Sequence, residues 1–241
     1  ATSGRGSGVV GYNVQAAVDA ENHLIVAHDV VTTGSDRSQL SRMAQAAKAA
    51  LLAERLEVVA DRGYYNSQEI LACDRLGVAV TAPKPQTSGA KAAGRFDRAD
   101  FRYVPEENVY VCPAGERLTW RMETEERGLT FHRYWTTACE RCRLKAQCTP
   151  SPMRRVTRWE HEHVLEAAQR RLDENPAAMR QRRETVEHPF GTLKARMGAT
   201  HFLTKRLKNV STEMSLHVLA YNMKRVMNIL GTKGLIQAMR A

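Results

Sequence analysis

The sequence predicts an α/β protein with a mixed sheet, and three observations carry this prediction. Between residues 12 and 85 the pattern runs strand, strand, helix, strand, helix, strand, which is typical of an α/β domain. Residues 105–150 hold four of the five cysteines among short strand-like pieces. Helical patterning resumes near residue 160 and continues almost to the end. A chain of 241 residues is long enough for one sizeable core with a small inserted module.

The individual elements follow from apolar periodicity. Alternation over residues 12–19 and 23–31 predicts an antiparallel hairpin. Apolar residues at helical spacing predict a helix over about 37–55, with Asp36 as its cap. Short apolar runs at 57–60 and 78–82 predict two further strands, separated by a helix that begins at Ser67. Residues 86–104 are polar and contain glycine, so we expect a loose linker there.

Two helices are expected in the C-terminal part. The first includes Arg180–Met197, although His188-Pro189 would normally disrupt a helix interior and therefore indicates a specific local geometry. The second covers about 211–230. Its apolar stripe is predicted to consist of Met214, Leu216, Leu219, Met223, Val226 and Leu230.

The charge balance indicates the class of partner. Lys and Arg outnumber Asp and Glu by 36 to 26, a net charge of +10, which favours a polyanion such as DNA or RNA. The alternative is a basic surface that only keeps the protein in solution. No run of about 18 apolar residues is present, and the N-terminus lacks the pattern of a secretion signal. We therefore expect a cytoplasmic, nucleoid-associated protein with no membrane partner.

Asp61 is the first candidate functional residue. It follows the apolar run Val58–Ala60 and precedes a turn that contains Gly63. A carboxylate at the carboxyl end of a buried strand is held rigidly at a crevice, where metal ions often bind. An Asp at such a junction is also a common turn former or helix cap, so this position alone leaves both interpretations open.

Glu187 is the second candidate. Arg183 lies four residues before it and Lys194 seven residues after it, so the three side chains are expected on one side of a helix. This pattern alone also fits an ordinary surface of salt bridges.

Four motifs together resemble bacterial insertion-sequence transposases of the DDE type. In order they are Gly-Tyr-Asn-Val-Gln at 11–15, Ala-Asp-Arg-Gly-Tyr at 60–64, Arg183-x3-Glu187-x6-Lys194, and Tyr-Asn-x-Lys-Arg at 221–225. The third is similar to the family's Tyr-x2-Arg-x3-Glu-x6-Lys motif, except that Arg180 stands in the Tyr position. The cysteine motifs resemble one branch of these proteins. The resemblance covers nearly the whole chain.

The resemblance implies a ribonuclease H-like fold that gathers Asp, Asp and Glu around two Mg²⁺ ions. Asp61 would be the second carboxylate and Glu187 the third, while Arg183 and Lys194 would contact DNA phosphates. The implied activity is cleavage and strand transfer of double-stranded DNA at transposon ends and target. A homodimer is implied for the complete enzyme.

The family's first Asp lies on a strand upstream of the Gly-Tyr-Asn-Val-Gln motif, and no acidic residue precedes Tyr12 here. Asp19, Asp29 and Asp36 are the early acidic residues; Asp19 is interpreted as a turn residue and Asp36 as a helix cap, so neither is assigned to the site. We therefore expect a sheet that lacks its first strand, and a chain that is inactive alone.

The cysteines predict a structural zinc site. Cys139-x2-Cys142 has the spacing of a zinc knuckle, and Cys112 and Cys148 complete a four-thiolate set. The alternative is four thiols without a metal. His132 and the Glu-His-Glu-His run at 160–163 are weaker candidate ligands that fit a solvated face. Cys73 is expected to be a small buried hydrophobe.

These observations predict three regions and leave three functions to compare. The regions are 10–85, the ribonuclease H-like part without its first strand; 86–155, a linker and Cys-rich insertion; and 156–241, the helical C-terminal part. The leading function is a DDE transposase segment. The alternatives are a non-catalytic, zinc-stapled DNA-binding remnant of a transposase and a ribonuclease H-like nuclease of another purpose, against which the Arg-x3-Glu-x6-Lys motif argues.

Overall fold

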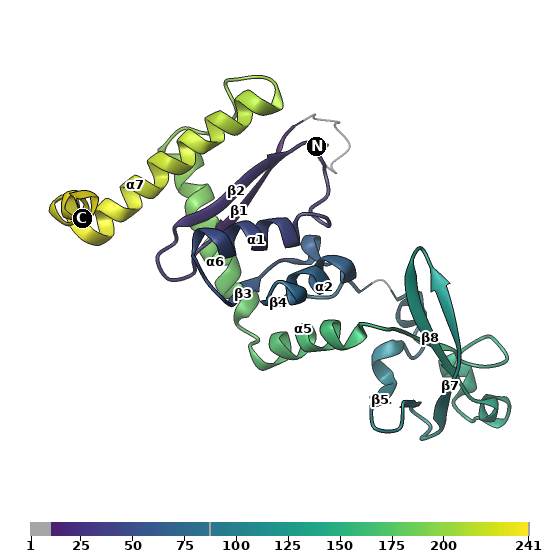
Figure 1. Ribbon diagram of the computed structural model, residues 1–241. Helices are drawn as coiled ribbons and strands as arrows, with labels where there is room; N and C mark the ends of the chain where they lie inside the picture. Colours follow the sequence, from purple (N-terminus) through teal and green to yellow (C-terminus); the bar gives the residue numbers. More distant parts are fainter. Residues whose placement is uncertain (1–10, 87, 241) are drawn as a thin grey trace. The chain divides into compact units, whose positions relative to one another are not determined.

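The computed structural model describes residues 11–86 and 88–240 and confirms the α/β class (Figure 1). The chain divides into two compact units. Unit 1 consists of the chain up to Lys84 and from Val164 on, and unit 2 consists of Pro85–His163. The predicted first region begins at residue 10, which lies outside the described residues.

The strands of unit 1 form two separate pairs. β1 (Asn13–Val18) pairs with β2 (Ile25–Val31) in an antiparallel hairpin, and β3 (Leu56–Val59) pairs with β4 (Val78–Thr81) in parallel. No hydrogen-bonded ladder joins the two pairs within the described residues, so the single mixed sheet expected from the sequence is not continuous there. Among the residues that the structure describes, β1 and β3 therefore each pair with a strand on one side.

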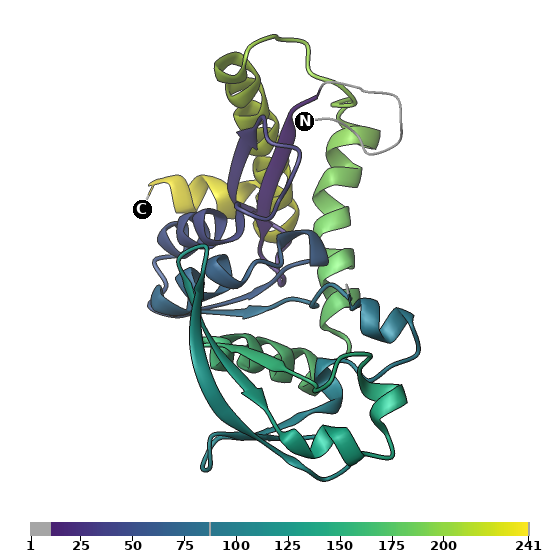
Figure 2. The ribbon, with the colours of Figure 1, turned by 90° about the vertical axis from the view of Figure 1, so that its right-hand side faces the viewer.

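Helices between and after these strands complete unit 1. They are α1 (Leu40–Ala50), the 3₁₀ turn η1 (Arg62–Tyr64), α2 (Ser67–Arg75), α5 (Glu162–Glu174, which begins in unit 2), α6 (Ala178–Gly191), the π-helical turn η4 (Thr192–Arg196) and α7 (Leu207–Arg240). α6 contacts both β1 and β3, and Figure 2 shows it running beside the hairpin. It thus connects the two strand pairs.

Pro189 lies inside α6, and the helix continues from it into the π-helical turn η4. Proline lacks an N–H donor and crowds the preceding turn, so a local change of helix type is the usual accommodation. α7 contains one non-helical residue, Gly231, with φ 71° and ψ 164°. α7 therefore consists of two helical stretches that meet at a kink at Gly231.

The predicted apolar stripe of α7 is wrong for most of its members. The buried face is formed by Val210, Met214, Val218 and Tyr221, which pack with Ile25 and Val30 of the hairpin and with Leu193. Leu216, Leu219, Met223 and Leu230 are exposed. Apolar residues lie on two faces of α7. Their spacing does not show which face the hairpin covers, and the predicted stripe lies mostly on the other face.

Unit 2 is a five-stranded antiparallel sheet with short helices. The strands are β5 (Arg102–Val104), β6 (Val109–Val111), β7 (Arg117–Glu126), β8 (Leu129–Trp135) and β9 (Val156–Trp159). The short helices are α3 (Gly89–Ala92), η2 (Arg98–Asp100), η3 (Thr137–Arg141) and α4 (Lys145–Cys148). The expectation of a loose linker over 86–104 was wrong, because Asp97 and Asp100 form a capping box and Phe101 is buried.

Candidate active site

Asp61 lies directly after β3, where the sequence places it. The N–H of Ala60 donates to the carbonyl of Thr81, so the parallel pairing reaches the residue before the carboxylate. Asp61 caps η1, and its Oδ1 accepts the N–H of Gly63 at 2.8 Å. The side chain is 39% exposed. Asp61 is therefore both a turn cap and a carboxylate that solvent can reach.

Arg182 of α6 binds Asp61 through its guanidinium group. The Nη2 atom lies 2.9 Å from Oδ2 of Asp61, in a pair where Arg182 is 24% exposed. Both oxygens of Asp61 thus have a partner on the protein. Arg182 could not be recognised from the sequence, because its partner lies 121 positions away (182 − 61) and the spacing of residues gives no sign of such a pair.

Asp36 lies next to Asp61, although its expected role was to cap the first helix. The N-cap of α1 is Gln39, and the Oδ1 atom of Asp36 accepts from Asn13 Nδ2 at 2.7 Å and Gln15 Nε2 at 2.8 Å instead. A Cβ added to Gly63 would lie 3.0 Å from Asp61 Oδ1 and 3.5 Å from Asp36 Oδ2. The space that Gly63 leaves is therefore bordered by two carboxylates.

Gln15 connects this group to the turn after β3. It is 1% exposed, donates to Asp36 and accepts a hydrogen bond from the hydroxyl of Tyr64. Burial, together with the charges of Asp36 and Asp61, raises the pKa of Tyr64 above its ordinary value, so the hydroxyl stays a donor. The alternation that predicted β1 took Val14, Ala16 and Val18 as the inward side, which concealed the buried Gln15.

Glu187, Arg183 and Lys194 are all exposed. The inward side of α6 carries Ala178, Thr185 and Pro189, which are buried. Arg182 lies on that inward side. Glu187 comes five residues after Arg182, so its side chain points away from the inward side. Within the described residues no hydrogen bond or ion pair connects Glu187 to Asp61. The structure brings Asp36, Asp61 and Arg182 together, and it leaves Arg183, Glu187 and Lys194 on the outer surface.

The type of donor atom at Asp36 and Asp61 suits a divalent metal ion, but the number of grouped ligands does not. Hard carboxylate oxygens on both sides of the Gly63 space are the donors that Mg²⁺ prefers. Among the described residues, however, no three His, Cys, Asp or Glu side chains are grouped so that they could hold a metal ion. The donor chemistry fits a divalent ion, and Arg182 occupies one of the oxygens that such an ion would need.

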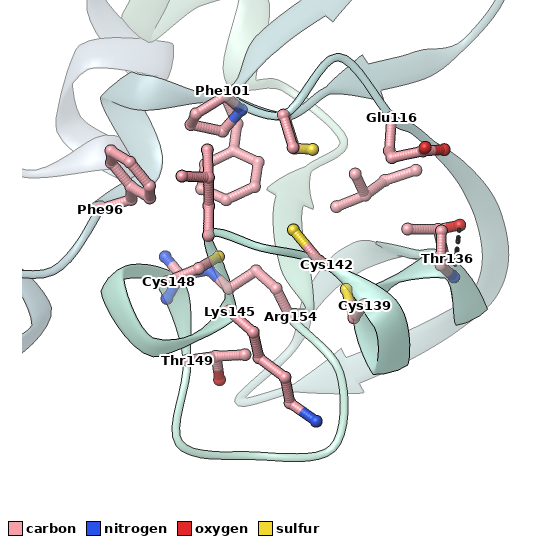
Figure 3. Close-up of a pocket in the computed structure, with 16 residues that line it drawn as sticks. Phe96, Phe101, Glu116, Thr136, Cys139, Cys142, Lys145, Cys148, Thr149 and Arg154 are labelled. Carbon is pink, nitrogen blue, oxygen red and sulfur yellow. Dashed lines mark hydrogen bonds between the residues drawn. The ribbon is translucent and has the colours of Figure 1, made fainter.

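The four clustered cysteines of unit 2 line one cavity of ≈ 20 Å³ (Figure 3). Cys112 follows β6, Cys139 lies in η3, Cys142 directly follows η3 and Cys148 ends α4, so the cysteines reach the cavity from three elements. Burial raises the pKa of Cys148; nearby Arg154 opposes this shift, while the other three thiols add to it. The four thiols therefore line the same cavity, although among the described residues no three of them are grouped closely enough to hold a metal ion.

The weaker candidate ligands lie elsewhere. His132 pairs with Glu123 across β7 and β8 at 3.3 Å, and His161 contacts the rings of Trp159 and His163. None of these histidines lines the cysteine cavity. Glu162 does not belong to a solvated face, because it is 5% exposed and binds Arg98 at 2.8 Å. Cys73 is fully buried as expected, and burial raises the pKa of its thiol to about 12.

None of the described helices is long and apolar enough to cross a membrane. No curated protein and no solved structure is detectably similar to the chain. Residues 111–227 match a family model described as "Transposase DDE domain". The matched segment includes the cysteine cluster as well as Arg183, Glu187 and Lys194. Over residues 111–227 this chain is therefore similar to the transposase DDE domain family, which supports the resemblance to insertion-sequence transposases.

Proposed function

We propose that this chain acts in DNA transposition as a DDE-type segment that binds double-stranded DNA at insertion-sequence ends. The match of residues 111–227 to the transposase DDE domain carries the proposal. Asp61 and Glu187 are proposed as carboxylates of the reaction, in a ribonuclease H-like arrangement. Each of β1 and β3 has an edge with no strand partner among residues 11–86 and 88–240, which is compatible with a sheet in which another strand lies between these two.

Divalent metal ions are proposed as the cofactor of this chemistry. When bound, Mg²⁺ activates the attacking oxygen and stabilises the leaving oxygen at phosphorus. The residues of this chain that would hold it are Asp61 and Glu187. A homodimer in the complete enzyme stays a prediction of the family resemblance.

DNA contact is proposed for the outer surface of α6 and η4. Arg183 and Lys194 are exposed and lie on either side of Glu187 in sequence, so they can reach phosphates without losing a partner inside the protein. Arginine suits bidentate contact with phosphate, and lysine acts as a point charge.

A salt titration of DNA affinity tests this surface. We expect Arg183→Gln and Lys194→Gln each to weaken binding to duplex DNA and to reduce the slope of log K against log salt concentration by about 1. Arg75→Gln, which removes an exposed charge from α2, is the matched control and should leave the slope close to that of the unaltered protein. Equal losses in all three variants would show general charge attraction and reject the proposed surface.

We also propose that Cys112, Cys139, Cys142 and Cys148 bind one structural Zn²⁺. A cavity of ≈ 20 Å³ has room for a single small occupant, since one water-sized sphere needs about 10–15 Å³. The main buried apolar cluster described in unit 2 is small and consists of Phe101, Tyr110, Leu118, Tyr134 and Val156. A metal staple would supplement such a core.

Metal analysis of the purified protein tests the zinc site. We expect about one equivalent of zinc, which Cys139→Ser should remove and Cys73→Ala, a thiol outside the cavity, should not. Less than about half an equivalent in the unaltered protein would reject the site. The non-catalytic, zinc-stapled DNA-binding protein predicts the same zinc and DNA results, but no divalent ion at Asp61.

A further inference from the structure

The ion pair between Arg182 and Asp61 has a consequence for metal binding. Asp61 Oδ1 accepts the N–H of Gly63 at 2.8 Å, and Oδ2 lies 2.9 Å from Arg182 Nη2. A carboxylate that ligates Mg²⁺ places an oxygen about 2.1 Å from the ion. The guanidinium and the ion would then be two cations within a few ångströms of each other, and their repulsion is strong where water is partly excluded.

The position of Arg182 on α6 explains why this residue, and not its neighbour, reaches Asp61. Ala178, Thr185 and Pro189 are buried and form the inward side of the helix, and Arg182 lies four residues after the first and three before the second. α6 contacts β3, the strand that ends at Asp61. Arg183 is the next residue along the helix, so its side chain points away from that of Arg182, and it is exposed.

The second carboxylate strengthens the attraction for any cation at this position. Asp36 Oδ2 borders the same Gly63 space as Asp61 Oδ1, while its Oδ1 is held by Asn13 and Gln15. Arg182 also lowers the pKa of nearby Tyr64, against the effects of burial and of both carboxylates. The guanidinium of Arg182 therefore places a positive charge beside Asp61 and Asp36.

We infer that Arg182 is a gating residue that competes with a divalent cation for Asp61. In the metal-free chain Arg182 neutralises Asp61, and binding of the ion requires the guanidinium to leave Oδ2. Because only chains with the ion pair open can bind the ion at Oδ2, a substitution that removes Arg182 should tighten metal binding. This inference rests on the proposed function, in which Asp61 is a metal ligand.

Binding of Mn²⁺ to the whole chain, followed by electron paramagnetic resonance, tests the competition. The variants are Arg182→Gln, Arg180→Gln as a control on the same helix, and Asp61→Asn. Arg180 is 79% exposed and pairs only loosely with Glu184, at 3.9 Å. We expect Arg182→Gln to tighten Mn²⁺ binding by about fivefold, Arg180→Gln to change it by less than about twofold, and Asp61→Asn to weaken it.

A second measurement follows Arg182 itself in the unaltered chain. In ¹⁵N spectra of arginine side chains, the signal that is missing from Arg182→Lys identifies Arg182. We expect that signal to shift when Mg²⁺ is added to the unaltered chain and to stay in place in Asp61→Asn.

The outcomes separate the inference from the function on which it rests. If Asp61→Asn binds Mn²⁺ as well as the unaltered chain, Asp61 is no ligand, and the proposed site and the gating role are both rejected. If Asp61→Asn weakens binding while Arg182→Gln gives no tightening and the Arg182 signal does not respond to Mg²⁺, the site stands and the gating role is rejected.

Discussion

At the scale of single residues, Gln15 determines how the turn after β3 is held. It is buried, and both ends of its amide are used, by Asp36 on one side and Tyr64 on the other. A buried amide with both groups paired fixes the positions of its partners, since leaving either group unpaired would be costly. Gln15 therefore links β1 to the turn that carries Asp61.

Tyr64→Phe should lower the free energy of unfolding by about 1–3 kcal/mol, because it leaves the buried Gln15 oxygen without a donor. Urea denaturation measures this difference. Tyr103→Phe is the control: the Tyr103 hydroxyl donates to Asn108 in an exposed hydrogen bond, so its loss should cost less. An equal cost for both substitutions would contradict the role given to Gln15.

The sequence predicted part of this site. The position of Asp61 at a strand end follows from the apolar run before it, and the structure places it there. Arg182 and Gln15 were missed, because their importance lies in partners distant along the chain. The assignments of Asp61, Glu187, Arg183 and Lys194 to catalysis and DNA contact stay predictions.

At the scale of elements, the Tyr-Asn-x-Lys-Arg motif of α7 clamps the β1–β2 hairpin. Asn222 accepts the N–H of Ile25 at 3.0 Å and donates to its carbonyl at 2.8 Å, as a neighbouring strand would. Tyr221 donates to the carbonyl of His23 at 2.7 Å, and Arg225 donates to that of Asn22 at 2.6 Å. The sequence showed this motif only as a family resemblance, and its contacts give it a structural role.

Asn222→Ala removes both hydrogen bonds to Ile25 and should lower the free energy of unfolding by about 2 kcal/mol. Asn209→Ala, at an exposed position of the same helix, should change it by less than about 0.5 kcal/mol. Urea denaturation of the two variants checks the clamp. If the two variants lose the same stability, the hydrogen bonds of Asn222 to Ile25 do not hold the hairpin as proposed.

The same region predicts a dependence of stability on pH. Burial, with smaller effects from His23, Arg225 and Arg196, lowers the pKa of His188; burial also lowers the pKa of His28, although Asp29 opposes this. A lowered pKa in the folded state means that the unfolded chain binds more protons. The stabilising contribution of the neutral form is therefore complete above the unfolded value of 6.5 and is lost as the pH falls toward the folded value.

The urea midpoint should therefore fall as the pH is lowered from 7 to 5. The His188→Gln variant should show a smaller fall, because it removes one of the two titrating groups. A midpoint that is constant or rises over this interval would show that the histidines are not held in their neutral form.

Element positions were easier to predict than their faces. The hairpin, the first two helices and the two short strands of unit 1 follow from periodicity, since local spacing determines them. Which side of α7 is buried depends on the elements that pack against it. Whether residues 86–104 adopt a regular structure depends likewise on their contacts with neighbouring segments. Leu216 and Leu219 were placed on the wrong side for that reason, and the capping box at Asp97 was missed.

At the scale of the whole molecule, the chain combines a unit that carries Asp61 and α6 with a unit that carries four cysteines. Its net charge of +10 favours a polyanion, and the family that residues 111–227 resemble implies DNA. We propose that Asp61 and Glu187 bind one divalent ion, although Glu187 is exposed on the outer side of α6 in this structure.

Iron-directed cleavage of the backbone tests that claim most directly. With hydrogen peroxide and ascorbate added, Fe²⁺ bound in place of Mg²⁺ reduces the peroxide to hydroxyl radicals that cut the chain near the ion. Only cuts suppressed by excess Mg²⁺ are counted, which sets aside iron held by the cysteines. The account predicts cuts near both residue 61 and residue 187, lost together in Asp61→Asn. Cuts near only one of these positions, or cuts that survive Asp61→Asn, would contradict it.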